Sequence, residues 1–352
     1  MTPITDLKVH RNDLIVATSG RSFWILDNLS LLSQYNANST SATLYQPEPI
    51  VYGRWGSSLN GNNDSFTGMQ PFEGINPANG IELYYYLPTI PDGSELTMSV
   101  KDASGKIINT YSSEKDKNYV PHNGGSAPPA PVLPYKEGLN RFVWNMQYPI
   151  VPGVPDVYIE AGFRGHKVSP GSYSITFNYN GQLLSKQAII QPNPNYNLSP
   201  AEYAEFDAFM TEVETKVTEM HTKVNALKKA EVAISKMIPK LKEKPSLLPL
   251  VTEGEALIKE IMAWDEQMVQ RRSQAYDDVE NFENKFTAEY LFMMNHANSS
   301  IPRVIQPSKD RKIELDRQWQ LLKGNANRLL NNRLPAYNKK LWEAGFGAID
   351  VE

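Results

Sequence analysis

The chain has 352 residues, a net charge of -4 and no cysteine. Its length suits roughly two or three domains, and its composition, 41% hydrophobic and 21% charged, is typical of a folded protein. The negative charge argues against the basic face that a nucleic-acid binder needs, and the lack of cysteine excludes disulfides and thiol chemistry. No run of about 18 apolar residues is present, so no membrane span is predicted.

The first predicted element is a three-stranded meander that covers residues 6–27. DLKVH, LIVAT and RSFWILD are rich in β-branched and aromatic residues, and RND and SG separate them at turn-forming positions. A sheet of three strands is barely stable alone, so its apolar face needs a cover. Counting every second residue places Leu14, Val16, Phe23 and Ile25 on that inward face. The polar stretch NANSTSAT then indicates a linker.

A second predicted domain covers residues 37–196 and contains most of the glycines and prolines. Short strand-like runs alternate with turn signals, and ASG and YNG are natural hairpin turns. This spacing predicts an immunoglobulin-like antiparallel β-sandwich in which Trp144 and Tyr173 point inward. The proline-rich stretches PHNGGSAPPAPVLP and YPIVPGVPD are predicted to be loops, because proline cannot join a central ladder.

Residues 197–352 are predicted to form a helical domain. Ser199, Pro200 and Glu202 form a helix-start signature, and three apolar stripes with helical spacing follow. Stripes of this kind predict a long antiparallel bundle of three helices, up-down-up. The first stripe is Phe206, Met210, Val213, Val217, Met220, Val224 and Leu227. The second is Leu257, Ile261, Trp264, Met268, Ala275, Val279, Phe282 and Phe286, and the third is Leu315, Trp319, Leu322, Ala326, Leu329 and Leu341.

Several of these motifs carry a resemblance to a known family. DLIVATSGRSFWILDN closely resembles the closing blade of the BNR-repeat, sortilin-like β-propellers of exported bacterial proteins, which are often labelled glycosyl hydrolases. LYQPEPIVYGRWG, GINPANGIELYYYLP, GLNRFVWNM, SPGSYSITF and LPAYNKKLWEAG are similar to the C-terminal segment of that family. The resemblance covers nearly the whole chain. It implies that residues 1–36 are the remnant of a last propeller blade, and that Met1 marks an expression, processing or gene-split boundary.

The resemblance also implies a function. We expect a non-catalytic C-terminal structural and interaction module, located outside the cytoplasm: in the periplasm, on the cell surface or secreted. Its expected partner is the upstream propeller of the same protein, or else another protein or a cell-surface component. The alternative is an accessory part of an exported glycoside hydrolase or peptidase whose active site lies in the propeller. The first residues, MTPITDLKV, show no signal peptide.

The usual catalytic signatures are absent from the sequence. It contains no G-x-G-x-x-G, P-loop, H-E-x-x-H or G-x-S-x-G, so no catalytic, cofactor-binding or metal-binding residue is predicted. The carboxylates of TEVETK and DDVENFENK could serve glycoside hydrolysis, but they are interpreted as solvated helix faces paired with lysines. No two histidines have ligand-like spacing, and His221 is interpreted as a surface residue. The histidines are His10, His122, His166, His221 and His296.

A few aromatic and basic residues remain as candidates for binding. GRSFW could be a stacking platform for carbohydrate, although alternation along a strand should direct Phe23 or Trp24 into a core. In YYYLP, Tyr84 and Tyr86 share one strand face, where sheet packing competes with an interface. Arg271 and Arg272 break the second stripe, and carboxylate pairing or solvation is favoured over an anion pocket. The candidate interface residues are Leu14, Val16, Phe23, Ile25, Tyr84 and Tyr86.

Overall fold

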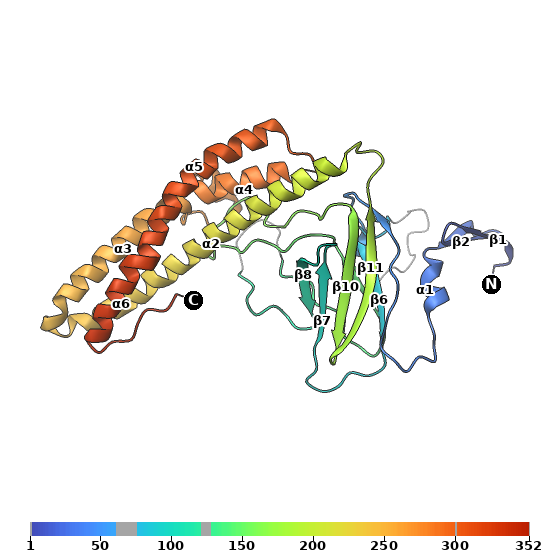
Figure 1. The fold of residues 1–352 in the computed structure, drawn as a ribbon, viewed down its shortest axis with the longest axis horizontal. Helices are drawn as coiled ribbons and strands as arrows, with labels where there is room; N and C mark the ends of the chain where they lie inside the picture. The colour runs from blue at the N-terminus through green and yellow to red at the C-terminus, as the bar shows by residue number, and fades with distance from the viewer. Residues whose placement is uncertain (1, 61–75, 121–127, 300, 352) are drawn as a thin grey trace. The chain divides into compact units, whose positions relative to one another are not determined.

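The computed structural model describes residues 2–60, 76–120, 128–299 and 301–351. Its contacts divide the chain into two compact units, one built from β-sheets and one built mainly from helices (Figure 1). The β unit comprises residues 1–116, 130–149 and 167–197, and the helical unit comprises residues 117–129, 150–166 and 198–352. The chain is therefore a multidomain β plus α protein, as predicted. None of the sheets formed by the described residues closes into a barrel.

The N-terminal meander forms as predicted. β1 (Ile4–His10), β2 (Asp13–Thr18) and β3 (Phe23–Leu26) make an antiparallel sheet in the order β1-β2-β3. Arg11 and Gly20 have left-handed backbone angles, φ 56° and 89°, which close the two turns. The short helix α1 (Leu29–Gln34) follows. By its contacts the meander belongs to the β unit, whereas the sequence placed residues 1–36 in a domain of their own.

Two further sheets make up the rest of the β unit. The predicted hairpins are confirmed: Asn180 and Gly181 both have positive φ in the two-residue turn between the last two strands. One sheet has the order β4-β6-β9 and the other has the order β5-β11-β10-β7-β8. The strands are β4 (Thr43–Leu44), β5 (Ile50–Val51), β6 (Ile81–Leu87), β7 (Leu96–Lys101), β8 (Ile107–Ser112), β9 (Gly138–Trp144), β10 (Gly171–Tyr179) and β11 (Gln182–Gln191).

Aromatic side chains from these two sheets pack against each other. Trp144 on β9 is fully buried, and its ring meets that of Tyr173 on β10 edge to face, with 5.4 Å between centroids. Both residues therefore point inward, as predicted. The alternating burial along β6 and β7 has the period of two that a half-buried strand requires. Two other ring pairs join the sheets, Tyr85 with Phe177 and Tyr111 with Phe142.

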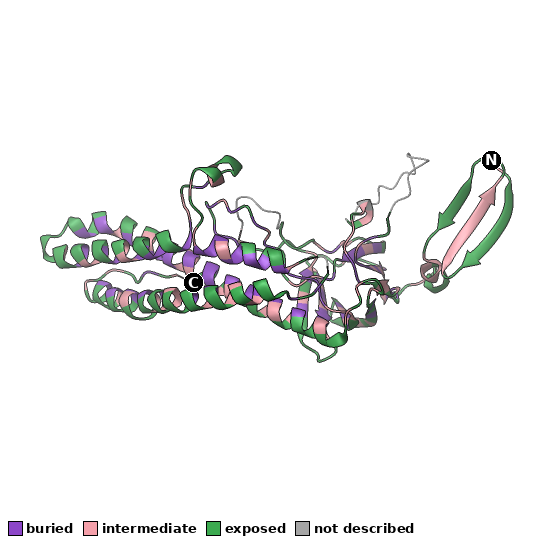
Figure 2. Cartoon of the chain, turned by 90° about the horizontal axis from the view of Figure 1, so that it is seen from above, coloured by how far each residue is buried: buried purple, intermediate pink, exposed green. Residues whose placement is uncertain are grey.

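The helical unit begins at the predicted capping box. The Ser199 hydroxyl accepts a hydrogen bond from the backbone of Glu202, whose carboxylate accepts one from the backbone of Ser199. The first apolar stripe is buried along its whole length, as predicted (Figure 2). The helices are α2 (Pro200–Lys242), α3 (Leu248–Met268), α4 (Phe286–Ala297), α5 (Gln306–Arg328) and α6 (Leu334–Glu343), and a π-helical turn (Leu329–Arg333) joins the last two.

The prediction that the second stripe forms one helix is wrong. α3 ends at Met268 and α4 begins at Phe286, while Ala275 is exposed between them. The polar run QRRSQ offers little apolar surface to bury, and a side chain ends the helix, because the Thr287 hydroxyl donates to the carbonyl of Met268 at 2.9 Å. The helical unit therefore contains more helices than the predicted three.

The helical unit also includes residues 150–166, which the sequence placed in the β domain. This segment contains all but the first two residues of the proline-rich stretch YPIVPGVPD and makes no β-ladder. Its apolar side chains, spaced every two or three residues, belong to the same buried cluster as α2 and α3. They are Val151, Val154, Val157, Ile159, Ala161 and Phe163. In the other proline-rich stretch, residues 121–127 lie outside the described residues.

Candidate functional site

One face of the N-terminal sheet has two central rows that carry only apolar side chains. The register pairs Leu7 with Val16 and Trp24, and residues directly opposite one another in antiparallel strands share a face. The next row is Val9, Leu14 and Leu26. We call these six residues the apolar face: Leu7, Val9, Leu14, Val16, Trp24 and Leu26.

The opposite face of the sheet is mixed. It pairs Asp6 with Ala17 and Phe23, and Lys8 with Ile15 and Ile25. The expectation that Leu14, Val16, Phe23 and Ile25 share one inward face is therefore wrong, because the last two lie on the mixed face. Register depends on the length of the turn, and the turn after β2 pairs Val16 with Trp24.

Both faces of this sheet are open. Trp24 is 58% exposed and Phe23 is 75% exposed, so neither ring enters a core, contrary to the expectation from alternation. Leu7 and Val9 are also exposed, and the whole of β2 is only half-buried (Figure 2). Contiguous exposed apolar surface on a folded chain marks an interaction site.

The other two candidate interface residues lie on β6. Tyr84 and Tyr86 are half-buried, while Tyr85 between them is 1% exposed. The Tyr84 hydroxyl donates to Glu82 at 3.2 Å, and Arg141 donates to the same carboxylate at 2.6 Å. Burial raises the pKa of Tyr84, as does the Glu82 charge. Tyr84 thus belongs to a polar cluster on its own sheet.

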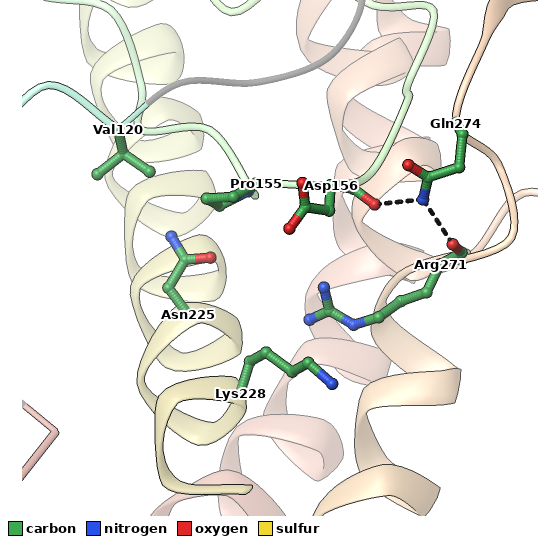
Figure 3. A pocket seen from close by; sticks show the side chains of 7 residues that line it. All are labelled: Val120, Pro155, Asp156, Asn225, Lys228, Arg271 and Gln274. Carbon is green, nitrogen blue, oxygen red and sulfur yellow. Dashed lines mark hydrogen bonds between the residues drawn. The ribbon is translucent and has the colours of Figure 1, made fainter. Parts of the chain in front are cut away.

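The helical unit contains a pocket of about 340 Å³ (Figure 3). One wall is α2, which contributes Asn225 and Lys228, and another is the turn after α3, which contributes Arg271 and Gln274. The remaining wall comes from Val120, Pro155 and Asp156. Charged groups of both signs therefore face one small space.

Hydrogen bonds fix the walls of this pocket. Asn225 donates to the carbonyl of Gly153 at 2.9 Å, which ties the loop to α2. Gln274 donates to the carbonyl of Asp156 at 2.6 Å, and the backbone of Tyr158 donates to the carbonyl of Ser273 at 2.8 Å. The pocket is therefore formed before any ligand arrives, which lowers the entropic cost of binding.

Arg271 is oriented by a buried carboxylate. Its Nε and Nη2 donate to the two oxygens of Asp265 at 2.6 and 2.7 Å, a bidentate pair, and Asp265 is 7% exposed. The predicted carboxylate pairing of Arg271 is thus confirmed. The neighbouring Arg272 instead stacks on the ring of Phe282, 4.5 Å from its centroid. The sequence favoured carboxylate pairing over an anion pocket, whereas Arg271 both pairs with Asp265 and lines the pocket.

A second polar cluster surrounds His166, whose side chain is fully buried. Its Nδ1 lies 2.9 Å from Glu214 and its Nε2 lies 3.1 Å from Asp207, both on α2. Burial alone would lower the pKa of His166, but the hydrogen bonds and charges of the two carboxylates raise it overall. Only an imidazolium can donate to both oxygens at once. Glu214 is therefore not a solvated lysine partner, as TEVETK suggested, whereas Glu212 does pair with lysine.

Lys167 is the matching buried cation of the β unit. It is 5% exposed, and its ammonium donates to the carbonyl of Gly53 at 2.7 Å and to the side chain of Asn79. Burial lowers the pKa of Lys167 to about 7, and the nearby charge of Arg54 adds to that shift. The hydrogen bonds of the Lys167 ammonium hold the loop before β6 in place.

The other histidines that the structure describes do not come together in a site. His221 is fully buried rather than exposed as expected, because its Nδ1 contacts the carbonyl of Pro152 at 2.6 Å. His10 is exposed, and His122 lies outside the described residues. Within the described ranges, no group of three or more histidine and acidic side chains could hold a metal ion. No helix in that part of the chain is long and apolar enough to cross a membrane.

Comparison with family models, with curated proteins and with solved structures finds no match for this chain. The geometry of the N-terminal sheet, the pocket and the buried polar clusters therefore has to indicate what the chain binds.

Proposed function

We propose that the chain is a non-catalytic interaction module that docks through the apolar face of its N-terminal sheet onto another β-sheet. The observation that carries the proposal is the composition of that face: its six side chains are all apolar, and the Trp24 ring is 58% exposed. The charges of β1, Asp6 and Lys8, lie on the mixed face. A face without charge fits a dry contact with a second apolar sheet, as in stacked sheets.

The partner that fits this face is the neighbouring blade of a sortilin-like propeller in the same protein. The resemblance of residues 13–28 to a closing blade supports this, because each blade of a propeller packs one sheet face on the next blade. In this proposal, β6 to β11 form an immunoglobulin-like sandwich and the helices form an antiparallel bundle that together support the blade. The location that goes with this family is outside the cytoplasm.

The test measures binding of the chain to a sortilin-like propeller domain that lacks its last blade. We expect Trp24→Glu, on the apolar face, to weaken binding at least about tenfold, because it places a charge in a dry contact. The matched control is Phe23→Glu, one residue away on the mixed face and also exposed, which should change binding much less. Both positions are solvent-exposed, so neither substitution should unfold the chain.

Three results would contradict the proposal. The first is no binding to the propeller, and the second is an equal loss in the two variants. The third is self-association of the chain that Trp24→Glu abolishes, because the occupant of the face would then be a second copy. Turnover of a sialoside, glucoside or peptide by the pure chain would favour an enzyme instead.

A further inference from the structure

The pocket of the helical unit has an oriented cation on one side. Because Asp265 occupies Nε and one hydrogen of Nη2 of Arg271, the end of the guanidinium formed by Nη1 and the second hydrogen of Nη2 remains for a ligand. This end can hold a carboxylate through two parallel hydrogen bonds. Lys228, on the α2 wall, adds an ammonium as a second cation, although Glu231 contacts it as well.

An acidic group lies on the other side of the pocket. The carboxylate of Asp156 points into the pocket (Figure 3) and makes no hydrogen bond to any residue that the structure describes. Its backbone has a left-handed φ of 60°, and Gln274 holds its carbonyl. Aspartate tolerates this conformation better than most residues, and such positions often occur at functional sites. The acid is therefore placed to accept hydrogen bonds from a ligand.

The local charges select among ligand classes. Arg271 and Lys228 already contact Asp265 and Glu231, so with Asp156 the pocket carries no excess of positive charge for a phosphate. None of the seven lining residues is aromatic, so the stacking surface that a sugar ring prefers is missing. A ligand with one carboxylate and one ammonium matches both walls.

We propose that this pocket binds a small zwitterion, an amino acid or dipeptide, with its carboxylate on Arg271 and Lys228 and its ammonium on Asp156. The volume of about 340 Å³ is at the lower end of the range for small-molecule sites, which suits a ligand of this size. The site is separate from the apolar face of the N-terminal sheet, so it does not depend on the docking function.

The test titrates the full chain with glycylglycine and follows the side-chain amide resonances of Asn225 and Gln274. Two control compounds each lack one charge: N-acetylglycylglycine has no ammonium, and glycylglycinamide has no carboxylate. We expect glycylglycine to shift both resonances, and each control compound to bind at least about fivefold more weakly. No shift with glycylglycine, or equal binding of all three compounds, would overturn the proposal.

Two variants assign the two ends of the ligand. Asp156→Asn, at an exposed position, should remove the preference for glycylglycine over its N-acetyl form and keep the preference for a carboxylate. Arg271→Gln should remove the carboxylate preference, whereas Arg272→Gln, a neighbouring arginine outside the pocket, should leave binding unchanged. Equal weakening by the two arginine variants would assign binding to general surface charge. Asp156→Asn keeps the test valid if Arg271→Gln destabilises the helical unit.

Discussion

Replacing His166 by Ala should destabilise the helical unit strongly. The substitution leaves Glu214, 8% exposed, as a carboxylate without its cation on α2. Breaking a buried ion pair by removing one partner costs about 3–5 kcal/mol of unfolding free energy. Asp207 is 32% exposed at its side chain and can be solvated, so the lower half of that range is expected.

The loss should depend on pH in a defined direction. The pKa of His166 is raised above its ordinary value of 6.5, so the folded state holds a proton that the unfolded state releases. The stabilisation is fully present below pH 6.5 and is lost as the pH rises through the raised folded pKa. The stability difference between the native chain and His166→Ala should therefore shrink as the pH rises from about 6 through the raised folded pKa, by roughly 1.4 kcal/mol for each unit by which the pKa is raised.

Urea unfolding followed by far-ultraviolet circular dichroism measures this, because the long helices dominate that signal. Glu214→Gln is the second variant. It keeps a polar side chain beside His166 but removes one charge, so it should lower the pH dependence without creating a cavity. A stability difference that does not change as the pH rises from about 6 would refute the view that an imidazolium binds the two carboxylates.

Two other substitutions test the β unit. Trp144→Ala should cost about 3–5 kcal/mol, because the ring is fully buried against Tyr173; an unchanged denaturation midpoint in near-ultraviolet circular dichroism would contradict this. Burial lowers the pKa of Lys167 from 10.5 to about 7. Between these two pH values the unfolded chain holds a proton that the folded chain has released, so the free energy of unfolding should rise by a few kcal/mol as the pH increases through that window. Lys167→Met should remove this rise in urea unfolding, and a variant with the same slope as the native chain would exclude Lys167 as its source.

Local signals predicted much of this fold. The capping box at Ser199 and the two-residue turn at Asn180 depend on neighbouring residues alone, and both formed where the sequence placed them. The faces of the N-terminal sheet were assigned wrongly, because alternation was carried from β2 to β3 without the register that the turn sets.

Polar residues brought together over long distances could not be predicted in the same way. His166 contacts residues 41 and 48 positions away, and no spacing rule in a single sequence links them. One signal was available: Asp207 and Glu214 are seven residues apart and so share a helix face, next to the first apolar stripe. Arg271 was correctly paired with a carboxylate, but the pocket depends on the 150–166 segment, whose place in the helical unit was missed.

The position of the 150–166 segment has a consequence for the order of folding during synthesis. Asn295 exchanges two hydrogen bonds with the backbone of Gly162, 133 residues earlier in the chain. At about 5–20 residues per second, synthesis of that interval takes on the order of ten seconds. During that time the valines of the segment have α2 to pack against but not yet α4. A chaperone that recognises extended apolar segments should therefore bind nascent chains that end between Gly162 and Asn295, and release longer ones.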